Sequence, residues 1–288
     1  MKKYAVIDIG SNSVRLMIVA DGKVLYKTLE TTRLGEGLAS CPRLKAEAIE
    51  RSANAVANFY RRAINEGAET VLAFATAAAR TAENGDKFVE RVKTLCGLTV
   101  EIIAGETEAE IGILGALGFN DGTLIDIGGA STEIVVQKNK RTVYKKSVDI
   151  GVVRLKDGCG RDKEKLLSTM RTAEKEYGDI VLQGQAYAIG GTATTVAAQI
   201  LGLTEYKSDK ITGAKIRLKQ VQVLADKLLK MPIEEIADLP CMPKGRADVI
   251  AGGALWLARI MERFSIQTLI VSDRDNLEGY AIKKGFEV

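Results

Sequence analysis

Three glycine-rich turns are the places where this sequence could bind an anion. DIGSNS starts at Asp8, DIGGAS starts at Asp126 and AIGGTATT starts at Ala188. In each motif the glycine or glycines follow an apolar run. Glycine lets the backbone approach a ligand closely, with consecutive amides turned toward it. Phosphate suits such amides, and the hydroxyl groups of nearby serine and threonine add further donors. For any one turn alone, a tight turn without a ligand is the alternative.

Aspartates open two of these turns. A carboxylate beside bound phosphate is repulsive unless a cation lies between them, and Mg²⁺ binds one or two carboxylates together with water and phosphate oxygens. Asp8 and Asp126 are therefore candidate Mg²⁺ ligands, directly or through water. The alternative is that each carboxylate caps its own turn.

The sequence contains no histidine. This excludes Ser-His-Asp triads, Cys-His dyads and histidine-ligated metals, so a general base must be Asp, Glu, Lys, Tyr or Cys. Glu106, Glu108 and Glu110 open a predicted short helix, and Glu133 follows the second glycine turn. A carboxylate among these four is the best available base for activating water. For the three in the helix, simple complementation of the helix dipole is the alternative.

Two arginines lie in segments rich in small residues, where a long side chain has room to reach a ligand. Arg33 lies in TTRLGEGL and Arg80 in ATAAAR. Guanidinium binds phosphate through two parallel hydrogen bonds, so both are candidate phosphate ligands. The alternative is ordinary surface charge.

Composition narrows the class of protein. The chain has 288 residues, 46% of them hydrophobic and 27% charged, with a net charge of +4. These values indicate a globular protein of one large domain or two, and favour a small anionic substrate over nucleic acid. No apolar run is long enough to suggest a signal peptide or a membrane span, so we expect a cytoplasmic protein. Cys41, Cys96, Cys159 and Cys241 form no CxxC pair and are expected to be buried free thiols.

Strand-like and helix-like patterns alternate along the chain, which indicates an α/β protein. We predict strands over Tyr4–Ile9, Ser13–Val19, Lys23–Leu29, Glu69–Ala75, Leu98–Ala104, Thr142–Val148, Ala186–Ile189 and Gln267–Asp273, with another starting at Thr123. We predict helices over Lys45–Glu66, Asp86–Cys96, Asp162–Tyr177, Ala193–Leu201, Arg217–Met231, Arg246–Phe264 and Leu277–Lys284.

The pattern of the first segment restarts after a constant offset. Val6–Ser13 aligns with Leu124–Ser131 at an offset of 118, with five of eight positions identical, and both copies open a hairpin. Such a repeat indicates two similar α/β domains. We expect residues 1–121 to form the first and residues 122–288 the second, with the final helix, about 278–288, able to pack back on the first.

Taken together, these motifs resemble a known family. DIGSNSVRLMI, RLGEGL, ATAAAR, AGETEAE, DIGGASTE, AIGGTATT and VSDRDNLEG occur in the order seen in the exopolyphosphatase/guanosine pentaphosphate phosphohydrolase (Ppx/GppA) family. The resemblance covers essentially the whole chain. It implies two ribonuclease H-like domains of the actin, Hsp70 and sugar kinase type around a central cleft, and a short form of the family without its C-terminal helical domains.

The resemblance also implies a function and roles for individual residues. The family removes the terminal phosphate from inorganic polyphosphate or from pppGpp with Mg²⁺, and we expect the same of this chain. Glu108 corresponds to the catalytic base and Glu133 to a second essential carboxylate that helps to position water. Asp8 and Asp126 are similar to the acidic residues near Mg²⁺. The residues that look like phosphate ligands are Gly10, Ser11, Asn12, Ser13, Arg33, Arg80, Gly128, Gly129, Ala130, Ser131, Gly190, Gly191 and Thr192.

Two departures and three alternatives accompany this interpretation. Ala130 stands where the family usually has a third glycine, which is compatible unless the position needs a positive φ. Leu277 replaces an arginine of the closing motif. The alternatives are a pppGpp phosphohydrolase, a kinase of the same superfamily, and a sensor that binds polyphosphate or guanosine phosphates without hydrolysis. A homodimer is compatible with each of them.

Overall fold

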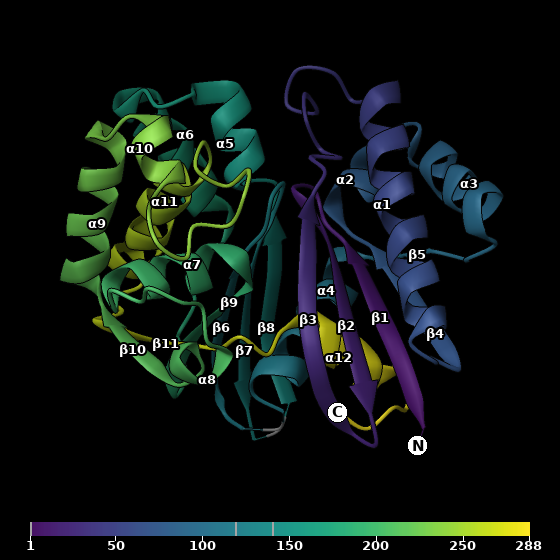
Figure 1. Cartoon of the computed structure of the whole chain (residues 1–288). Helices are drawn as coiled ribbons and strands as arrows, with labels where there is room; N and C mark the ends of the chain where they lie inside the picture. Colours follow the sequence, from purple (N-terminus) through teal and green to yellow (C-terminus); the bar gives the residue numbers. More distant parts are fainter. Residues whose placement is uncertain (1, 119, 140) are drawn as a thin grey trace. The chain divides into compact units, whose positions relative to one another are not determined.

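The computed structural model describes residues 2–118, 120–139 and 141–288, which divide into two units. The first unit comprises Met1–Gly115 and Asn276–Val288, and the second comprises Ala116–Asp275. Each contains a mixed β-sheet with helices (Figure 1).

The first unit is built on a five-stranded sheet in the order β3-β2-β1-β4-β5. Its elements are β1 (Lys3–Ile9), β2 (Ser13–Ala20), β3 (Lys23–Thr31), α1 (Ala46–Asn65), β4 (Thr70–Ala75), α2 (Ala77–Thr81), α3 (Gly85–Cys96), β5 (Glu101–Ile102), α4 (Gly105–Ala116) and α12 (Asn276–Lys283). β1, β2 and β3 form an antiparallel meander, while β4 joins β1 in parallel. Asp21 and Gly22 both have positive φ, which suits the tight turn between β2 and β3.

Side chains of β1 point alternately to the two faces of the first sheet, and this alternation determines the face on which Asp8 lies. Ile7 and Ile9 belong to the core that includes residues of α1 and α3. Tyr4 and Val6 belong to a separate core with residues of α4 and α12. Successive side chains of a strand point to opposite faces, so Asp8 lies on the face that carries α4.

The second unit is built on a six-stranded sheet in the order β10-β11-β9-β6-β7-β8. Its elements are β6 (Gly122–Ile127), β7 (Thr132–Lys138), β8 (Arg141–Val148), α5 (Val152–Cys159), α6 (Lys163–Glu176), β9 (Gln185–Ile189), α7 (Gly190–Ile200), α8 (Ser208–Ile211), β10 (Ala214–Arg217), α9 (Leu218–Lys230), α10 (Ile233–Ala237), α11 (Ile250–Arg263) and β11 (Thr268–Val271). Its core is centred on α11, whose Trp256 is fully buried.

The two sheets repeat one meander in the same register. Asp8 faces Arg15 across β1 and β2, and Arg15 faces Leu29 on β3. At the offset of 118 residues, Asp126 faces Glu133, which faces Ser147 on β8. The duplication inferred from eight residues therefore extends through three strands in each unit.

The division into units differs from the border expected at residues 121 and 122. The Gln137 side chain on β7 donates to the carbonyls of Gly118 and Asn120, at 3.3 and 2.8 Å, which ties this stretch to the second sheet. At the other end, Lys283 of α12 pairs with Glu110 of α4, which places α12 in the first unit.

Several details of the local structure differ from expectation. The strand expected over Leu98–Ala104 is only Glu101–Ile102, because β5 pairs with just the last two residues of β4. α2, α5, α8, β10 and α10 were not predicted, since elements this short carry little periodicity. The four cysteines are free as expected, but the expectation that they are buried is wrong: Cys41 is exposed and the other three are half-buried.

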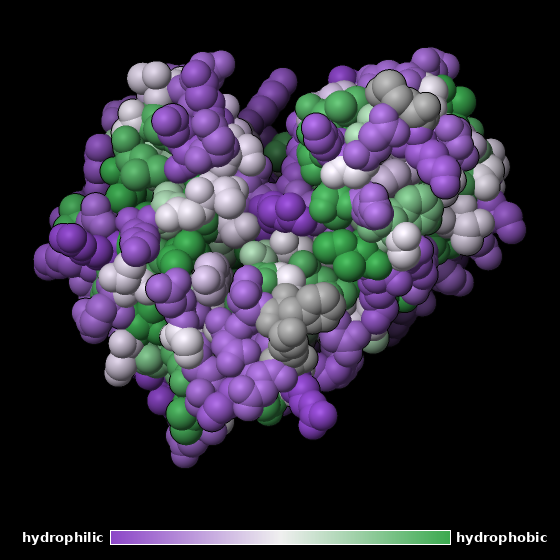
Figure 2. All heavy atoms as spheres, turned by 90° about the horizontal axis from the view of Figure 1, so that it is seen from below, coloured by the Kyte–Doolittle hydropathy of each residue, from purple (hydrophilic) through white to green (hydrophobic). Residues whose placement is uncertain are grey.

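Within the described ranges, no helix combines the length and the apolar character needed to cross a membrane. Figure 2 shows hydrophilic residues interspersed with apolar ones on the face seen from below.

Candidate active site

In the first unit, the aspartate at the end of β1 is paired with an arginine on β2. Asp8 is 4% exposed, and Arg15 Nε donates to Asp8 Oδ2 at 2.9 Å while Arg15 Nη2 donates to the same oxygen. Arg15 was not among the residues expected at the site. Antiparallel pairing across the predicted turn, which places Arg15 opposite Asp8, is the signal that could have found it.

Glu108 is the buried one of the three glutamates at the start of α4. It is 7% exposed, whereas Glu106 is exposed and Glu110 pairs with Lys283 at 2.9 Å. Arg80 Nη1 donates to Glu108 Oε2 at 2.9 Å and to the carbonyl of Ile103 at 3.1 Å. The structure therefore brings together two residues that were singled out separately.

Burial raises the pKa of Glu108 above its ordinary value. The guanidinium of Arg80 acts in the opposite direction, and the negative charge of Asp8 adds to the increase in pKa. Desolvation is the largest effect, because removing water disfavours the ionised carboxylate. A carboxyl group with a raised pKa, held by one arginine, is suited to accept a proton.

The first glycine turn is tied to the segment that carries Arg33. The Gly10 amide donates to the Ser13 carbonyl at 3.0 Å, and the Asn12 carbonyl accepts from the amides of Thr32 and Arg33 at 3.1 and 2.9 Å. Arg33 has a φ of 52°, a left-handed conformation that is costly outside glycine and concentrates at functional sites. Among the described residues, neither polar atom of the buried Asn12 amide has a hydrogen-bond partner.

The second unit places two carboxylates opposite each other. Asp126 is 8% exposed and Glu133 is 2% exposed, and they are register partners on β6 and β7. Ser147 Oγ on β8 donates to Glu133 Oε1 at 2.5 Å. Ser147 was not expected from the sequence, because nothing in the isolated β8 segment distinguishes it.

The second glycine turn has the same backbone closure as the first. The Gly128 amide donates to the Ser131 carbonyl at 3.0 Å, and the carbonyls of Gly128 and Gly129 accept from the amides of Val152 and Val153. Ala130 is buried and does not have a positive φ. An alanine is therefore compatible with this turn.

The third glycine turn is the first turn of α7. Gly190 has a φ of 78°, and a Cβ built there would lie 2.5 Å from Asp126 Oδ1, so the aspartate and this turn are in contact. A Cβ on Gly191 would overlap the guanidinium of Arg246. The first amides of a helix lack partners within the helix and favour anions.

Two side chains at this third turn differ from expectation. Thr192 Oγ1 donates to the carbonyl of Ile127 at 3.0 Å, so its hydroxyl hydrogen is already used within the protein. The backbone amide of Thr192 is therefore the group suited to an anion. Arg246, which is 8% exposed, was not predicted as a site residue. It is the first residue of the helix predicted over Arg246–Phe264, and nothing in the isolated sequence marks it as a site residue.

The donor set is suited to a cation that takes few ligands from protein. Within residues 2–118, 120–139 and 141–288, no three His, Cys, Asp or Glu residues come together as a metal cage. Each unit instead has a buried aspartate that opens a glycine turn, Asp8 in the first and Asp126 in the second. Mg²⁺ accepts one or two carboxylate oxygens when phosphate and water supply the rest.

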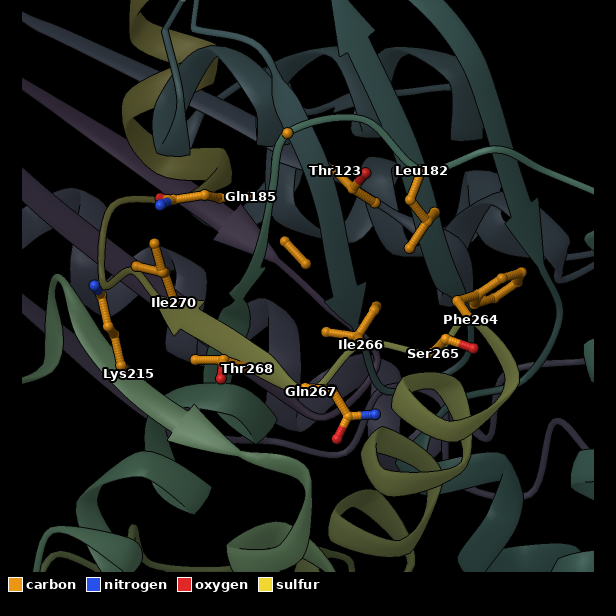
Figure 3. A pocket seen from close by; sticks show the side chains of 12 residues that line it. Thr123, Leu182, Gln185, Lys215, Phe264, Ser265, Ile266, Gln267, Thr268 and Ile270 are labelled. Atoms are coloured by element: carbon orange, nitrogen blue, oxygen red, sulfur yellow. The ribbon is translucent and has the colours of Figure 1, made fainter.

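A hollow of about 510 Å³ in the second unit lies away from these residues. It is lined by residues at the starts of β6 and β9 and along β11, including Thr123, Gln185 and Thr268, and among the described residues that line it only Lys215 is charged (Figure 3). The glycine turns lie at the opposite ends of β6 and β9. The hollow therefore takes no part in the site described here.

Comparison with known proteins decides the family. The Ppx/GppA phosphatase family matches residues 16–284. The chain belongs to the Ppx/GppA phosphatase family. This membership classes the chain as a hydrolase that acts on phosphorus-containing anhydrides.

Individual members of the Ppx/GppA family match along nearly their whole length. Exopolyphosphatase 2 of Mycobacterium tuberculosis is 31% identical, and the match covers 98% of both chains. The crystal structure of the Aquifex aeolicus family member is 30% identical with a TM-score of 0.79, covering 98% of this chain and 97% of that one. The crystal structure of an exopolyphosphatase-like protein is 26% identical with a TM-score of 0.91, covering 98% of each. The predicted fold of two α/β domains is confirmed.

Proposed function

We propose that this protein is a Mg²⁺-dependent exopolyphosphatase, which releases the terminal phosphate of inorganic polyphosphate through a water molecule activated by Glu108. The observation that carries the proposal is the buried Glu108 beside Arg80, in a chain without histidine. The relative named exopolyphosphatase 2 supports polyphosphate as the substrate.

The phosphate groups would be bound by the glycine turns and by arginines. Backbone amides of Gly10–Ser13, Gly128–Ser131 and Gly190–Thr192 supply donors without charge. Asn12 supports this role, because its buried amide lacks a hydrogen-bond partner among the described residues and gains one when an anion or water binds. Arg33 and Arg80 would add positive charge to the terminal and penultimate phosphates.

Asp8 and Asp126 would hold Mg²⁺, directly or through water. The ion supplies neutralisation of the phosphate oxygens when it is bound. Asp126 suits this role because it touches the Gly190 turn. A cation bound to Asp126 would therefore lie next to the backbone amides that would donate hydrogen bonds to phosphate. Asp8 shares its carboxylate with Arg15, so a cation bound there would compete with that ion pair.

In the reaction, the oxygen of a water molecule forms a bond to the terminal phosphorus and the bridging P–O bond breaks. Glu108 takes a proton from the attacking water, and Glu133 helps to orient that water. The electron pair of the broken bond stays with the shortened polyphosphate chain. Catalysis of this kind consists mainly of positioning and charge stabilisation.

The test is phosphate release by wild type and by Glu108→Gln, which keeps the shape of the side chain and removes its basicity. Long polyphosphate, short polyphosphate, pppGpp and ATP are assayed in parallel with Mg²⁺. We expect release from polyphosphate, lowered by a factor of about 10²–10⁴ in the variant, with substrate binding retained. A variant that keeps wild-type turnover contradicts the proposed base. Preferential release from pppGpp would change the substrate and keep the mechanism.

A further inference from the structure

Glu133 is held by a side chain from the neighbouring edge strand. Ser147 on β8 is its register partner, and Ser147 Oγ donates to Glu133 Oε1 at 2.5 Å. We propose that Ser147 is a positioning residue that fixes the Glu133 carboxylate for its role in the reaction. The inference rests on the proposed function, since it concerns the water-orienting carboxylate of that site.

The duplicated meander explains why a hydroxyl group is needed at this place. In the first unit the middle strand carries Arg15, whose charge is balanced by Asp8 on β1, and the third strand carries Leu29. In the second unit the middle strand carries Glu133, which faces Asp126.

Like charges opposite each other across a sheet destabilise the pair. The neighbour of Glu133 on β6 therefore cannot hold it as Asp8 holds Arg15. Its register neighbour on β8 is Ser147, where the first copy has the apolar Leu29. A hydroxyl group can donate one hydrogen bond to a carboxylate, and it carries no charge that would repel a phosphate.

The backbone on the other side of Glu133 is anchored by a buried network. Trp256 Nε1 donates to Thr132 Oγ1 at 3.0 Å, and that hydroxyl donates to the Ile150 carbonyl at 2.5 Å. The Tyr177 hydroxyl donates to the Thr132 carbonyl at 2.8 Å. Burial raises the pKa of Tyr177, and the charge of Glu133 raises it further, so the phenol keeps the proton that it donates.

Together these contacts hold Glu133 at both ends. The network fixes the peptide bond that precedes it, and the remaining freedom is rotation within its own side chain, which the Ser147 hydrogen bond restricts. Misplacing a reacting or orienting group by about 1 Å can lower the rate by about 10²-fold. Loss of the hydroxyl should therefore lower kcat by about 10-fold or more, and change KM little, because Glu133 orients water and does not hold phosphate.

The experiment measures kcat and KM for phosphate release from polyphosphate by wild type, Ser147→Ala and Ser147→Thr. Threonine keeps the hydroxyl and suits a strand, so Ser147→Thr should recover most of the kcat lost in Ser147→Ala. Thr142→Ala removes an exposed hydroxyl from the same strand and is the matched control, with kcat unchanged. Thermal unfolding of each variant separates loss of positioning from loss of the fold.

A double-mutant cycle with Glu133→Gln tests whether Ser147 acts through Glu133. We expect Ser147→Ala to lower kcat in the wild-type background and to add less than 2-fold in the Glu133→Gln background. Equal losses in both backgrounds, or a wild-type kcat in Ser147→Ala, overturn the inference while the proposed function stands. Absence of phosphate release by wild type overturns the proposed function, and the inference with it.

Discussion

At the scale of single residues, the central feature is Glu108, whose pKa is raised by burial and lowered by its partner Arg80. Arg80 stabilises the ionised form of Glu108 at 2.9 Å, while burial favours the neutral form and prevails. In a chain without histidine, this is a way to obtain a base whose pKa lies above that of an exposed glutamate. Glu108 and Arg80 were each singled out from the sequence, but their pairing was not predicted, because Arg80 lies 28 positions earlier in the chain.

The raised pKa of Glu108 predicts the acid limb of the activity profile. A base acts only when it is deprotonated, so activity should be lost as the pH falls through this raised value. The acid limb of kcat/KM should therefore lie above the ordinary glutamate range. In Arg80→Gln the guanidinium that lowers the pKa is gone, so the limb should move to higher pH. A limb that moves to lower pH, or that lies in the ordinary range in wild type, contradicts this assignment.

At the scale of elements, the sequence was informative where patterns are long and uninformative where position depends on packing. The predicted helix over Lys45–Glu66 is α1, and the predicted long helix over Arg246–Phe264 contains α11. The register that places Asp126, Glu133 and Ser147 in one row was not predicted, since it depends on three strands pairing. The sequence analysis allowed the final helix to pack on the first domain, but it did not predict the contact of α12 with α4, because that contact joins segments from the two ends of the first unit.

Packing of α12 on α4 predicts a sensitive glycine. A Cβ on Gly279 would lie 1.6 Å from the carbonyl oxygen of Ile111 in α4, so the two helices meet through backbone. Gly279→Ala should lower the free energy of unfolding by about 1–3 kcal/mol and lower kcat, since α4 also carries Glu108. Chemical denaturation and phosphate release measure the two effects.

Gly252→Ala is the matched control for this prediction. Gly252 is also helical, in α11, but a Cβ there would make ordinary contacts at 3.7 and 3.8 Å. Its replacement should leave stability unchanged or raise it by up to about 1 kcal/mol. Equal destabilisation by both substitutions would show that close helix contact is not what makes Gly279 necessary.

At the scale of the whole molecule, one meander is used twice with different charges. The first copy pairs Asp8 with Arg15 and is internally neutralised, whereas the second sets Asp126 against Glu133. The two copies therefore carry opposite charges at the same register position of the middle strand, Arg15 in the first and Glu133 in the second. This asymmetry is a property of the complete chain, because it appears only when the two copies are compared.

The proposed Mg²⁺ role of Asp126 predicts how the protein responds to loss of metal. Removing divalent cations with EDTA should abolish phosphate release, and added Mg²⁺ should restore it. Asp126→Asn should raise the Mg²⁺ concentration needed for half-maximal release by about 10-fold or more. Asp226→Asn, which removes an exposed carboxylate paired with Lys163, is the control and should leave that concentration unchanged. Full activity in EDTA would contradict a role for Mg²⁺.

The most direct test of the account is the fate of solvent oxygen during hydrolysis. Polyphosphate is incubated with the wild-type protein and Mg²⁺ in water enriched in oxygen-18, and the released phosphate is analysed by mass spectrometry. Water attack on the terminal phosphorus predicts a single solvent-derived oxygen in each released phosphate and none in the shortened chain. Label in the shortened chain, or phosphate transfer to an acceptor without incorporation of label, would contradict the proposed reaction.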